Sequence, residues 1–250
     1  MRPPRALAAA VARRILSPFV PSSKMLPFLC WLHKIATEYD PYLAHLDWFC
    51  GSAGTAIDIG ANEGRYTYPL SKRFRRVYAF EINSEITGRI KQYNPGNIEL
   101  VNCGLSSTAG AVTLYLPVAG GRALTGWGTM HREILPAEFA VTEKECRIAP
   151  LDEFGITGVD FVKIDVEGHE VEVLKGAART IERSRPIVLI EVRTVHERTV
   201  EDWFLARDYR QCRFDPWDRL VALTGFVPST GDCLYVPHER LALLGLAHSA

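Results

Sequence analysis

The sequence predicts an α/β protein built on a doubly wound, mostly parallel β-sheet. Three apolar runs, at residues 55–59, 161–165 and 186–192, are nearly continuous, as is typical of strands covered on both faces. Helical patterns separate the runs, and this alternation favours right-handed crossovers between parallel strands. Because no linker rich in Pro, Gly or Ser divides the 250 residues, we expect one domain, 51–250, preceded by a basic N-terminal helical extension, 1–50.

The other elements are expected in chain order. Two more core strands are predicted at residues 76–80 and 98–102. Helices are predicted over residues 63–74, 84–92, 168–183 and 200–207. A strand pair, 111–117 with 144–150, is expected around a loop rich in Gly and Thr, and 208–214 with 231–237 is expected as a final antiparallel hairpin at the sheet edge.

Composition bounds the class of partner and the compartment. With 29 Lys and Arg against 29 Asp and Glu, the formal net charge is zero, and no basic–aromatic stripe is present, so a nucleic-acid partner is not expected. The six cysteines include no C-x-x-C pair and no zinc-finger spacing, so no metal site is expected. Cysteines in apolar stretches such as "DCLYV" favour reduced thiols and a cytoplasmic location.

The N-terminal stretch differs from the rest because no acid precedes Glu38. Its basic residues are Arg2, Arg5, Arg13, Arg14, Lys24 and Lys34. The apolar run "ALAAAVA" is far shorter than the roughly 20 residues of a membrane span. Four interpretations stay open: a signal peptide, an organelle transit peptide, a helix lying at the surface of an anionic membrane, and a structural arm packed loosely on the domain.

The most informative turn follows the first predicted strand, in "GTAIDIGANEGRYTYPL". In an open α/β sheet such a turn borders the ligand, and Gly60 and Gly64 permit a tight turn and close backbone approach. The glycine fingerprint of dinucleotide sites would require glycine where Asn62 and Arg65 stand. Glu63 also disfavours a pyrophosphate at the helix start. The turn therefore favours a nucleoside ligand without phosphates.

Two carboxylates indicate what that nucleoside carries. Asp58, at the end of the first predicted strand, can attract a cationic group. Glu81 closes the second strand, where its two oxygens can accept hydrogen bonds from both hydroxyls of a ribose. S-adenosylmethionine combines a ribose diol with a cationic methionine tail and has no phosphate, so it is the expected cofactor. The alternative is a tight α/β turn in which Glu81 is merely solvated.

Several stretches together resemble the FkbM family of class I S-adenosylmethionine-dependent methyltransferases. In chain order they are "AIDIGANEGRYT", "VYAFEINSE", "IELVNCGLSS", "LDEFGI", "VDFVKIDVEGHEVEVLKGA" and "RPIVLIEV". The resemblance runs from Thr55 to Val192. It implies a Rossmann-like, seven-stranded sheet and the transfer of a methyl group to a hydroxyl of a saccharide, glycolipid or secondary metabolite.

The resemblance also implies which residues hold the cofactor. They are Asp58, Gly60, Ala61, Asn62, Gly64, Tyr66, Glu81, Asn102, Gly104, Leu105 and Asp165. In this class an acid after the third strand often binds the adenine amino group, and this chain has no acid there. Adenine contacts are therefore expected from backbone groups or from Ser106.

Methyl transfer to an aliphatic hydroxyl needs a base, because the pKa of such a hydroxyl is high. The segment "IDVEGHE" leaves the fourth core strand, and its Asp165, Glu167 and His169 are the candidate catalytic residues. Asp165 is expected to orient the cofactor or acceptor, while Glu191 and His196 approach from the neighbouring loop. The alternative for Glu167 is a cap on the next helix. A catalytic metal is not expected, because "EVRT" stands where metal-dependent catechol methyltransferases carry an Asp-Asn pair.

The choice of acceptor is assigned to the loop at 119–133, "AGGRALTGWGTMHRE". Its Arg122, Trp127 and His131, with His196, are the predicted acceptor-binding residues. Trp127 can stack on a sugar ring, and Arg122 can pair with a phosphate or carboxylate. The alternative is an ordinary solvent loop whose Trp127 packs back on the sheet.

The leading hypothesis is an S-adenosylmethionine-dependent O-methyltransferase with a small-molecule or glycan acceptor. Methyl transfer to a lipid, peptide or amine is the alternative among enzymes. A non-catalytic S-adenosylmethionine-binding protein is the alternative in a different class, and a nicotinamide or flavin oxidoreductase is disfavoured by Asn62. Contact with a membrane surface through the basic N-terminus stays open.

Overall fold

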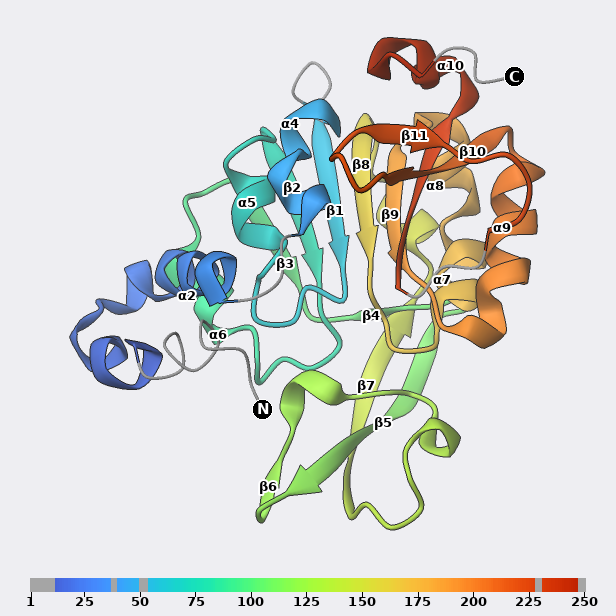
Figure 1. Cartoon of the computed structure of the whole chain (residues 1–250). Helices are drawn as coiled ribbons and strands as arrows, with labels where there is room; N and C mark the ends of the chain where they lie inside the picture. The colour runs from blue at the N-terminus through green and yellow to red at the C-terminus, as the bar shows by residue number, and fades with distance from the viewer. Residues whose placement is uncertain (1–11, 37–39, 50–53, 228–230, 247–250) are drawn as a thin grey trace.

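The computed structural model describes residues 12–36, 40–49, 54–227 and 231–246. Within them, an eight-stranded sheet has the order β11-β10-β12-β9-β8-β1-β2-β3 (Figure 1). Its parallel strands are β1 (Thr55–Ile59), β2 (Arg76–Phe80), β3 (Ile98–Val101), β8 (Val159–Ile164) and β9 (Ile187–Glu191). The predicted doubly wound, Rossmann-like α/β fold is confirmed.

The last three strands of this sheet run antiparallel to their neighbours. They are β10 (Tyr209–Phe214), β11 (Leu220–Ala222) and β12 (Asp232–Pro237). The two predicted terminal strands do pair, but β12 inserts between β9 and β10 instead of lying at the edge. The strand at this edge of the sheet is β11, so the sheet has eight strands and not the expected seven. β11 has only three residues, which are too few to show an alternating pattern in the sequence.

Helices cover both faces of the sheet (Figure 1). One face lies under α2 (Ser22–Ala36), α4 (Leu46–Phe49), α5 (Thr67–Ser71) and α6 (Gly88–Tyr93), and the other under α7 (Glu170–Gly176), α8 (Ala178–Ser184) and α9 (Glu197–Leu205). Successive strand residues enter different cores: Ala56 and Phe161 pack in one, Ile57 and Val162 in the other. Burial on both faces explains the nearly continuous apolar runs.

The helices differ from their predicted ranges. The helix predicted over 63–74 is confined to α5, because Gly64 has a φ of 95°, which no right-handed helix accommodates. The helix predicted over 84–92 begins only at Gly88, and the one predicted over 168–183 is divided at Ala177. Short 3₁₀ turns are η1 (Ser17–Phe19), η2 (Thr125–Trp127), η3 (Arg132–Ile134), η4 (Leu151–Phe154), η5 (Thr194–His196) and η6 (Ala242–Leu244).

A second sheet, of order β4-β7-β5-β6, projects beyond the main sheet (Figure 1). Its strands are β4 (Gly104–Leu105), β5 (Gly110–Ala119), β6 (Arg122–Ala123) and β7 (Val141–Ala149). β5 and β7 are antiparallel, so the predicted strand pair is confirmed. The loop between them folds back on β5 through a bridge from Thr129 to Tyr115.

The N-terminal segment packs against the domain. Leu26 of α2 is buried, and α2 lies on α5 and α6. Tyr42 of α3 (Pro41–Ala44) and Phe49 of α4 belong to the same core as Phe161. Most of the apolar run "ALAAAVA" lies outside the described residues, and the predicted boundary at residue 51 stays a prediction. No helix in the described ranges is both long enough and apolar enough to cross a membrane.

The cysteines that the structure describes carry free thiols. Cys103, Cys146, Cys212 and Cys233 are buried, as expected for cysteines in apolar stretches. Burial raises the pKa of the Cys212 thiol to about 12, so this group stays protonated at neutral pH. Cys50 lies outside the described residues.

Gly176 tests how tightly α7 is packed. A Cβ at this position would lie 2.0 Å from the carbonyl oxygen of Ser106. Gly176→Ala is therefore expected to lower the free energy of unfolding by about 1–3 kcal/mol. Gly88, where a Cβ would meet nothing within 4 Å, is the matched control, and Gly88→Ala should stabilise by at most about 1 kcal/mol. Denaturant unfolding measures both; equal values for the two variants would contradict the packing.

Candidate active site

Four polar side chains lie at the edge of the sheet where β1, β8 and β9 end. Asp58 pairs in register with Lys163, and Glu191 at the end of β9 pairs with Asp232 at the start of β12. Asp58 and Lys163 alternate with Ile57 and other residues of the opposite core, so they point to the face that α2 covers. The strand alternation thus brings four charges together on one side of the sheet.

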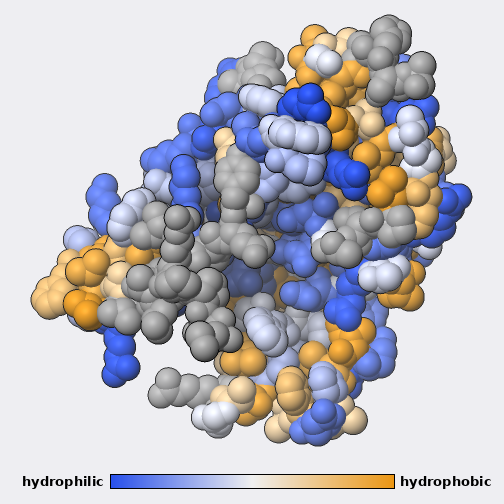
Figure 2. Space-filling model, viewed as in Figure 1, coloured by the Kyte–Doolittle hydropathy of each residue, from blue (hydrophilic) through white to orange (hydrophobic). Residues whose placement is uncertain are grey.

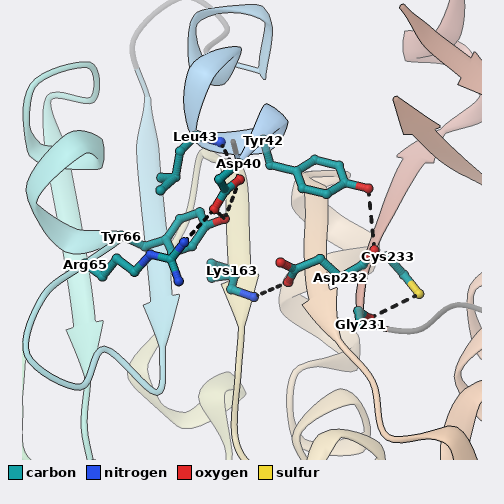
Figure 3. Close-up of polar contacts among 9 residues, drawn as sticks. All are labelled: Asp40, Tyr42, Leu43, Arg65, Tyr66, Lys163, Gly231, Asp232 and Cys233. Atoms are coloured by element: carbon teal, nitrogen blue, oxygen red, sulfur yellow. Dashed lines mark hydrogen bonds and ion pairs between the residues drawn. The ribbon is translucent and has the colours of Figure 1, made fainter. Parts of the chain in front are cut away.

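Lys163 is a buried charge with a fixed partner. Its Nζ donates a hydrogen bond to Oδ1 of Asp232 at 2.5 Å and lies 5.2 Å from the centre of the Tyr66 ring (Figure 3). Burial alone would lower the pKa of Lys163, but the carboxylates of Asp232 and Asp165 outweigh it and raise the pKa. Lys163 is therefore a permanent positive charge among the carboxylates.

Asp165 and Glu191 form a pair of neighbouring carboxyls near Lys163, close enough for the charge of Asp165 to act on Glu191. Burial, followed by the neighbouring charges, raises the pKa of both groups, that of Glu191 to about 7. The positive charge of Lys163 opposes the rise in each case. Because two adjacent carboxyls resist ionising together, the pair retains a proton near neutrality. A carboxyl with a pKa near 7 is suited to accept a proton at neutral pH.

The turn after β1 holds a second acid in place. Gly60 has a φ of 80°, and a Cβ there would lie 1.8 Å from the carbonyl oxygen of Asp165, so only glycine fits. The backbone N–H groups of Asn62 and Asn83 donate to Oε2 and Oε1 of Glu81, each at 2.8 Å. Burial raises the pKa of Glu81, and these backbone hydrogen bonds oppose the rise. Both carboxylate oxygens are thereby oriented.

A first cavity lies over this turn. Its lining includes Gly60, Asn62, Glu81, Gly104, Leu105, Gly126, Met130, Asp165 and Glu167. The side chain of Asn62 donates to the carbonyl oxygen of Gly126 at 3.3 Å, so the loop at 119–133 covers this cavity. Asn102, predicted for the same site, is exposed and does not line it, because the chain turns between β3 and β4 and points Asn102 to solvent.

A second cavity, of about 530 Å³, lies between the strand edge and α2. On one side it is lined by Asp58, Lys163, Asp165, Glu191 and Asp232, and on the other by Leu26, Leu29, Cys30, Leu32 and His33. Gly60, Asn62 and Asp165 line both cavities. A volume of several hundred Å³ is typical of small-molecule sites. Two ligands bound in these cavities would meet at Asp165.

Three further predicted cofactor residues lie around the second cavity or beneath α2. Ala61 and Tyr66 line it, and the Tyr66 hydroxyl donates to Oδ2 of Asp40 at 3.2 Å (Figure 3). Gly64 lies elsewhere: a Cβ there would be 3.0 Å from the Leu26 side chain, and Gly64 does not line either cavity. Gly64 permits the Leu26 and Ile90 side chains to pack closely, and its contact with the cofactor stays a prediction.

His169 is held in a chain of polar contacts. Its Nδ1 lies 3.0 Å from Nε2 of His131, and its Nε2 lies 2.9 Å from Oγ of Ser106. Nδ1 of His131 lies 3.1 Å from a carboxylate oxygen of Glu133. Burial, and then His131, lowers the pKa of His169. These contacts fasten the loop to the start of α7. Neither histidine lines the two cavities, and the predicted roles of Ser106, His131 and His169 stay predictions.

Glu167 and His196 differ in what they face. Glu167 lines the first cavity and a shallow pocket that also contains Glu191, and burial raises its pKa. His196 instead lies 3.0 Å from Oε2 of the buried Glu170. The predicted acceptor contact of His196 is thereby replaced by an ion pair or hydrogen bond inside the fold. Glu170 also accepts a hydrogen bond from the Gly168 N–H at 2.7 Å.

Trp127 is 65% exposed, so it does not pack back on the sheet. It lies in η2, in the loop over the first cavity. The side chain of Arg122 is outside the described part of the structure. Within the described residues, no group of three or more His, Cys, Asp or Glu side chains has the arrangement of a metal site.

The profile of the methyltransferase FkbM domain matches residues 58–214. This range covers more than half of the chain and contains both the turn after β1 and the strand edge. The chain belongs to the FkbM methyltransferase family. The resemblance found in the sequence is thereby confirmed.

One curated protein and several solved structures are similar to this chain. The hexuronic acid methyltransferase AglP of Haloferax volcanii is 29% identical over 141 residues, which are 54% of this chain and 54% of AglP. The chain thus spans about half the length of this relative. An FkbM methyltransferase structure from Methylobacillus flagellatus has 18% identity and a TM-score of 0.47, covering 92% of this chain and 58% of that one. A putative methyltransferase from Streptococcus mutans, solved with SAH, has 13% identity and a TM-score of 0.44, covering 80% and 98%.

The sequence predictions missed Lys163, Asp232 and the cavity-facing side of α2. A lysine inside the apolar run "FVKID" was the available signal, because a charge in a strand buried on both faces needs a partner. Leu26, Leu29 and Cys30 follow a helical spacing that marks one face of α2. That face could be predicted as buried, but not what it covers.

The lowered pKa of His169 predicts how the free energy of unfolding depends on pH. Because the pKa of His169 is lower in the folded chain, the unfolded state binds more protons, and the free energy of unfolding falls as pH drops below about 6.5. His169→Gln, which does not titrate, should reduce this loss. Denaturant unfolding at about pH 7.5 and about pH 5.5 measures it, with exposed His238→Gln as the control. If the native chain, His169→Gln and His238→Gln show the same pH dependence, His169 is not the group that destabilises the fold at low pH.

Proposed function

We propose that this protein is an S-adenosylmethionine-dependent O-methyltransferase that acts on a hydroxyl of a saccharide. The observation that carries the proposal is the meeting of the two cavities at Gly60, Asn62 and Asp165. The first cavity suits a nucleoside, and the second cavity suits a polar acceptor. A methyl donor and its acceptor must meet in line at one point, and the protein's main contribution is to align them.

The residues around the first cavity fit S-adenosylmethionine. A carboxylate offers about four acceptor positions, so the two amides that orient Glu81 leave room for ribose hydroxyls. Gly60, which lines both cavities, lets the backbone approach closely. Asp58 lines the adjoining second cavity and supplies negative charge for a cationic tail: burial raises its pKa to about 6, so it is mostly ionised at neutral pH. When bound, the cofactor would supply an activated methyl group and its own leaving group.

The carboxyl pair is the proposed proton acceptor. Glu191 lines the second cavity beside Asp165, and burial and the charge of Asp165 raise its pKa to about 7. In its ionised form it can take the proton from an acceptor hydroxyl as that oxygen is alkylated. Asp165, which lines both cavities, orients the reactants. His169 is the weaker candidate because both of its ring nitrogens are engaged by His131 and Ser106.

The second cavity supports a saccharide as acceptor. Its carboxylates can accept hydrogen bonds from several hydroxyls, and the opposite wall of Leu26 and Leu29 offers an apolar surface for the C–H face of a sugar. The relative AglP is named a hexuronic acid methyltransferase, which agrees with this class. Because acids outnumber Lys163 in the cavity, an amine is the second candidate acceptor. Mass spectrometry after incubation with S-adenosylmethionine and soluble hexosides, hexuronides and amines separates the two candidates.

Glu81→Gln tests the cofactor site. The amide nitrogen of glutamine must face either the Asn62 or the Asn83 N–H, so one oriented acceptor is lost. Affinity for S-adenosylhomocysteine, measured by calorimetry, should fall about 10-fold to 100-fold. Glu99→Gln makes the same chemical change at an exposed position of β3 and should bind as the native protein does. Unchanged affinity in Glu81→Gln would remove this residue from the site.

Glu191→Gln tests the proton acceptor. Because only the ionised carboxyl accepts a proton, kcat/KM of the native protein should rise with pH through about 7. Glu191→Gln should lose this rise and lower kcat by at least about 100-fold, with cofactor affinity unchanged. Glu99→Gln is again the control. If Glu191→Gln keeps the native pH profile, proton transfer belongs to another group, and Glu167→Gln is the next variant to measure.

A further inference from the structure

Helix α2 has two functional faces. Leu26, Leu29, Cys30 and His33 recur at helical spacing and line the second cavity. Lys24, Phe28 and Trp31 recur at the same spacing on the opposite side, where Phe28 and Trp31 stack on each other with ring centres 6.2 Å apart. The inner face is accounted for by the cavity. The outer face is not accounted for by any packing within the described fold.

Large apolar side chains are exposed on this segment. Phe19 is 82% exposed and Trp31 55%, and Ile15 and Leu16 are exposed as well. Figure 2 shows apolar side chains gathered on the projecting end of the molecule that Figure 1 colours dark blue. Single exposed apolar residues are common, but several together on one projecting segment mark an interaction surface.

The charged side chains within residues 12–36 all have one sign. Arg13, Arg14, Lys24 and Lys34 are exposed, and none of them forms an ion pair with a residue that the structure describes. No Asp or Glu precedes Glu38 in the sequence. A surface that combines exposed aromatic and aliphatic side chains with unpaired basic residues is complementary to a partner that is both anionic and apolar beneath its surface.

We propose that residues 12–36 dock onto the surface of an anionic lipid bilayer. Phe19 and Trp31 enter the headgroup region, and Arg14, Lys24 and Lys34 lie against lipid phosphates. Arg13 is both exposed on this segment and part of the cavity lining, so the cavity opens beside the docking surface. The docking surface holds none of the proposed catalytic residues, so this proposal does not depend on the proposed function.

Co-sedimentation with vesicles tests the proposal. The full chain should bind vesicles that contain phosphatidylglycerol at least about 10-fold more tightly than pure phosphatidylcholine vesicles, and binding should weaken as salt is raised. A triple variant that reverses three charges should abolish the preference for the anionic vesicles. It combines Arg14→Glu, Lys24→Glu and Lys34→Glu. The double variant Phe19→Gln, Trp31→Gln should lower binding to them about 10-fold or more.

The control variants separate docking from folding. Trp217→Gln replaces a tryptophan that is 75% exposed outside this segment, and it should bind vesicles as the native chain does. All variants should keep the native melting temperature and a cooperative thermal transition, which shows that the domain is folded. Equal binding of the native chain and the Phe19, Trp31 variant to anionic vesicles would overturn the proposal. So would a dimer in light scattering that the same two substitutions dissociate, because the face would then bind a second copy.

Discussion

A buried ammonium group constrains the whole site. The Lys163 side chain is 2% exposed, and an unpaired charge at such a position costs on the order of several kcal/mol. The fold must therefore bring carboxylates to it from other strands. Asp232 reaches Lys163 because β12 runs antiparallel beside β9, so that its first residue lies at the edge where the parallel strands end. The reversal of the last strands thus completes the site as well as the sheet.

The turns after β1 and β8 are joined as one unit. The Asp165 N–H donates to the carbonyl oxygen of Ile59 at 2.9 Å, and the missing side chain of Gly60 lets the two backbones touch. Asn62, whose N–H donates to Glu81, lies in the turn after β1. A displacement of this turn would therefore move Asp165 as well. The geometry between the two cavities is therefore set by backbone contacts, which hold a position more firmly than a flexible side chain does.

The sequence predicted what is encoded locally. β1 and β2 begin and end where expected, because a strand buried on both faces is recorded in its own residues. Gly60 directly follows β1 and Glu81 directly follows β2, so both positions could be predicted from local strand ends, while their contacts with a cofactor stay proposed. The partner of Lys163 lies 69 positions away, and no local pattern encodes that contact. The contacts of His169 are likewise not encoded locally. Its place after a core strand suggested proton transfer, but its two ring nitrogens contact His131 and Ser106, which are distant in the sequence.

Helix α2 covers the second cavity with one face and carries the exposed apolar and basic residues on the other. Any change in the position of α2 alters both surfaces at once. By thermodynamic linkage, a partner that favours one position of the helix changes the affinity of the cavity for its ligand, and the ligand changes the affinity for the partner by the same factor. The reciprocal coupling needs no relay through the sheet, because a single helix separates the two binding events.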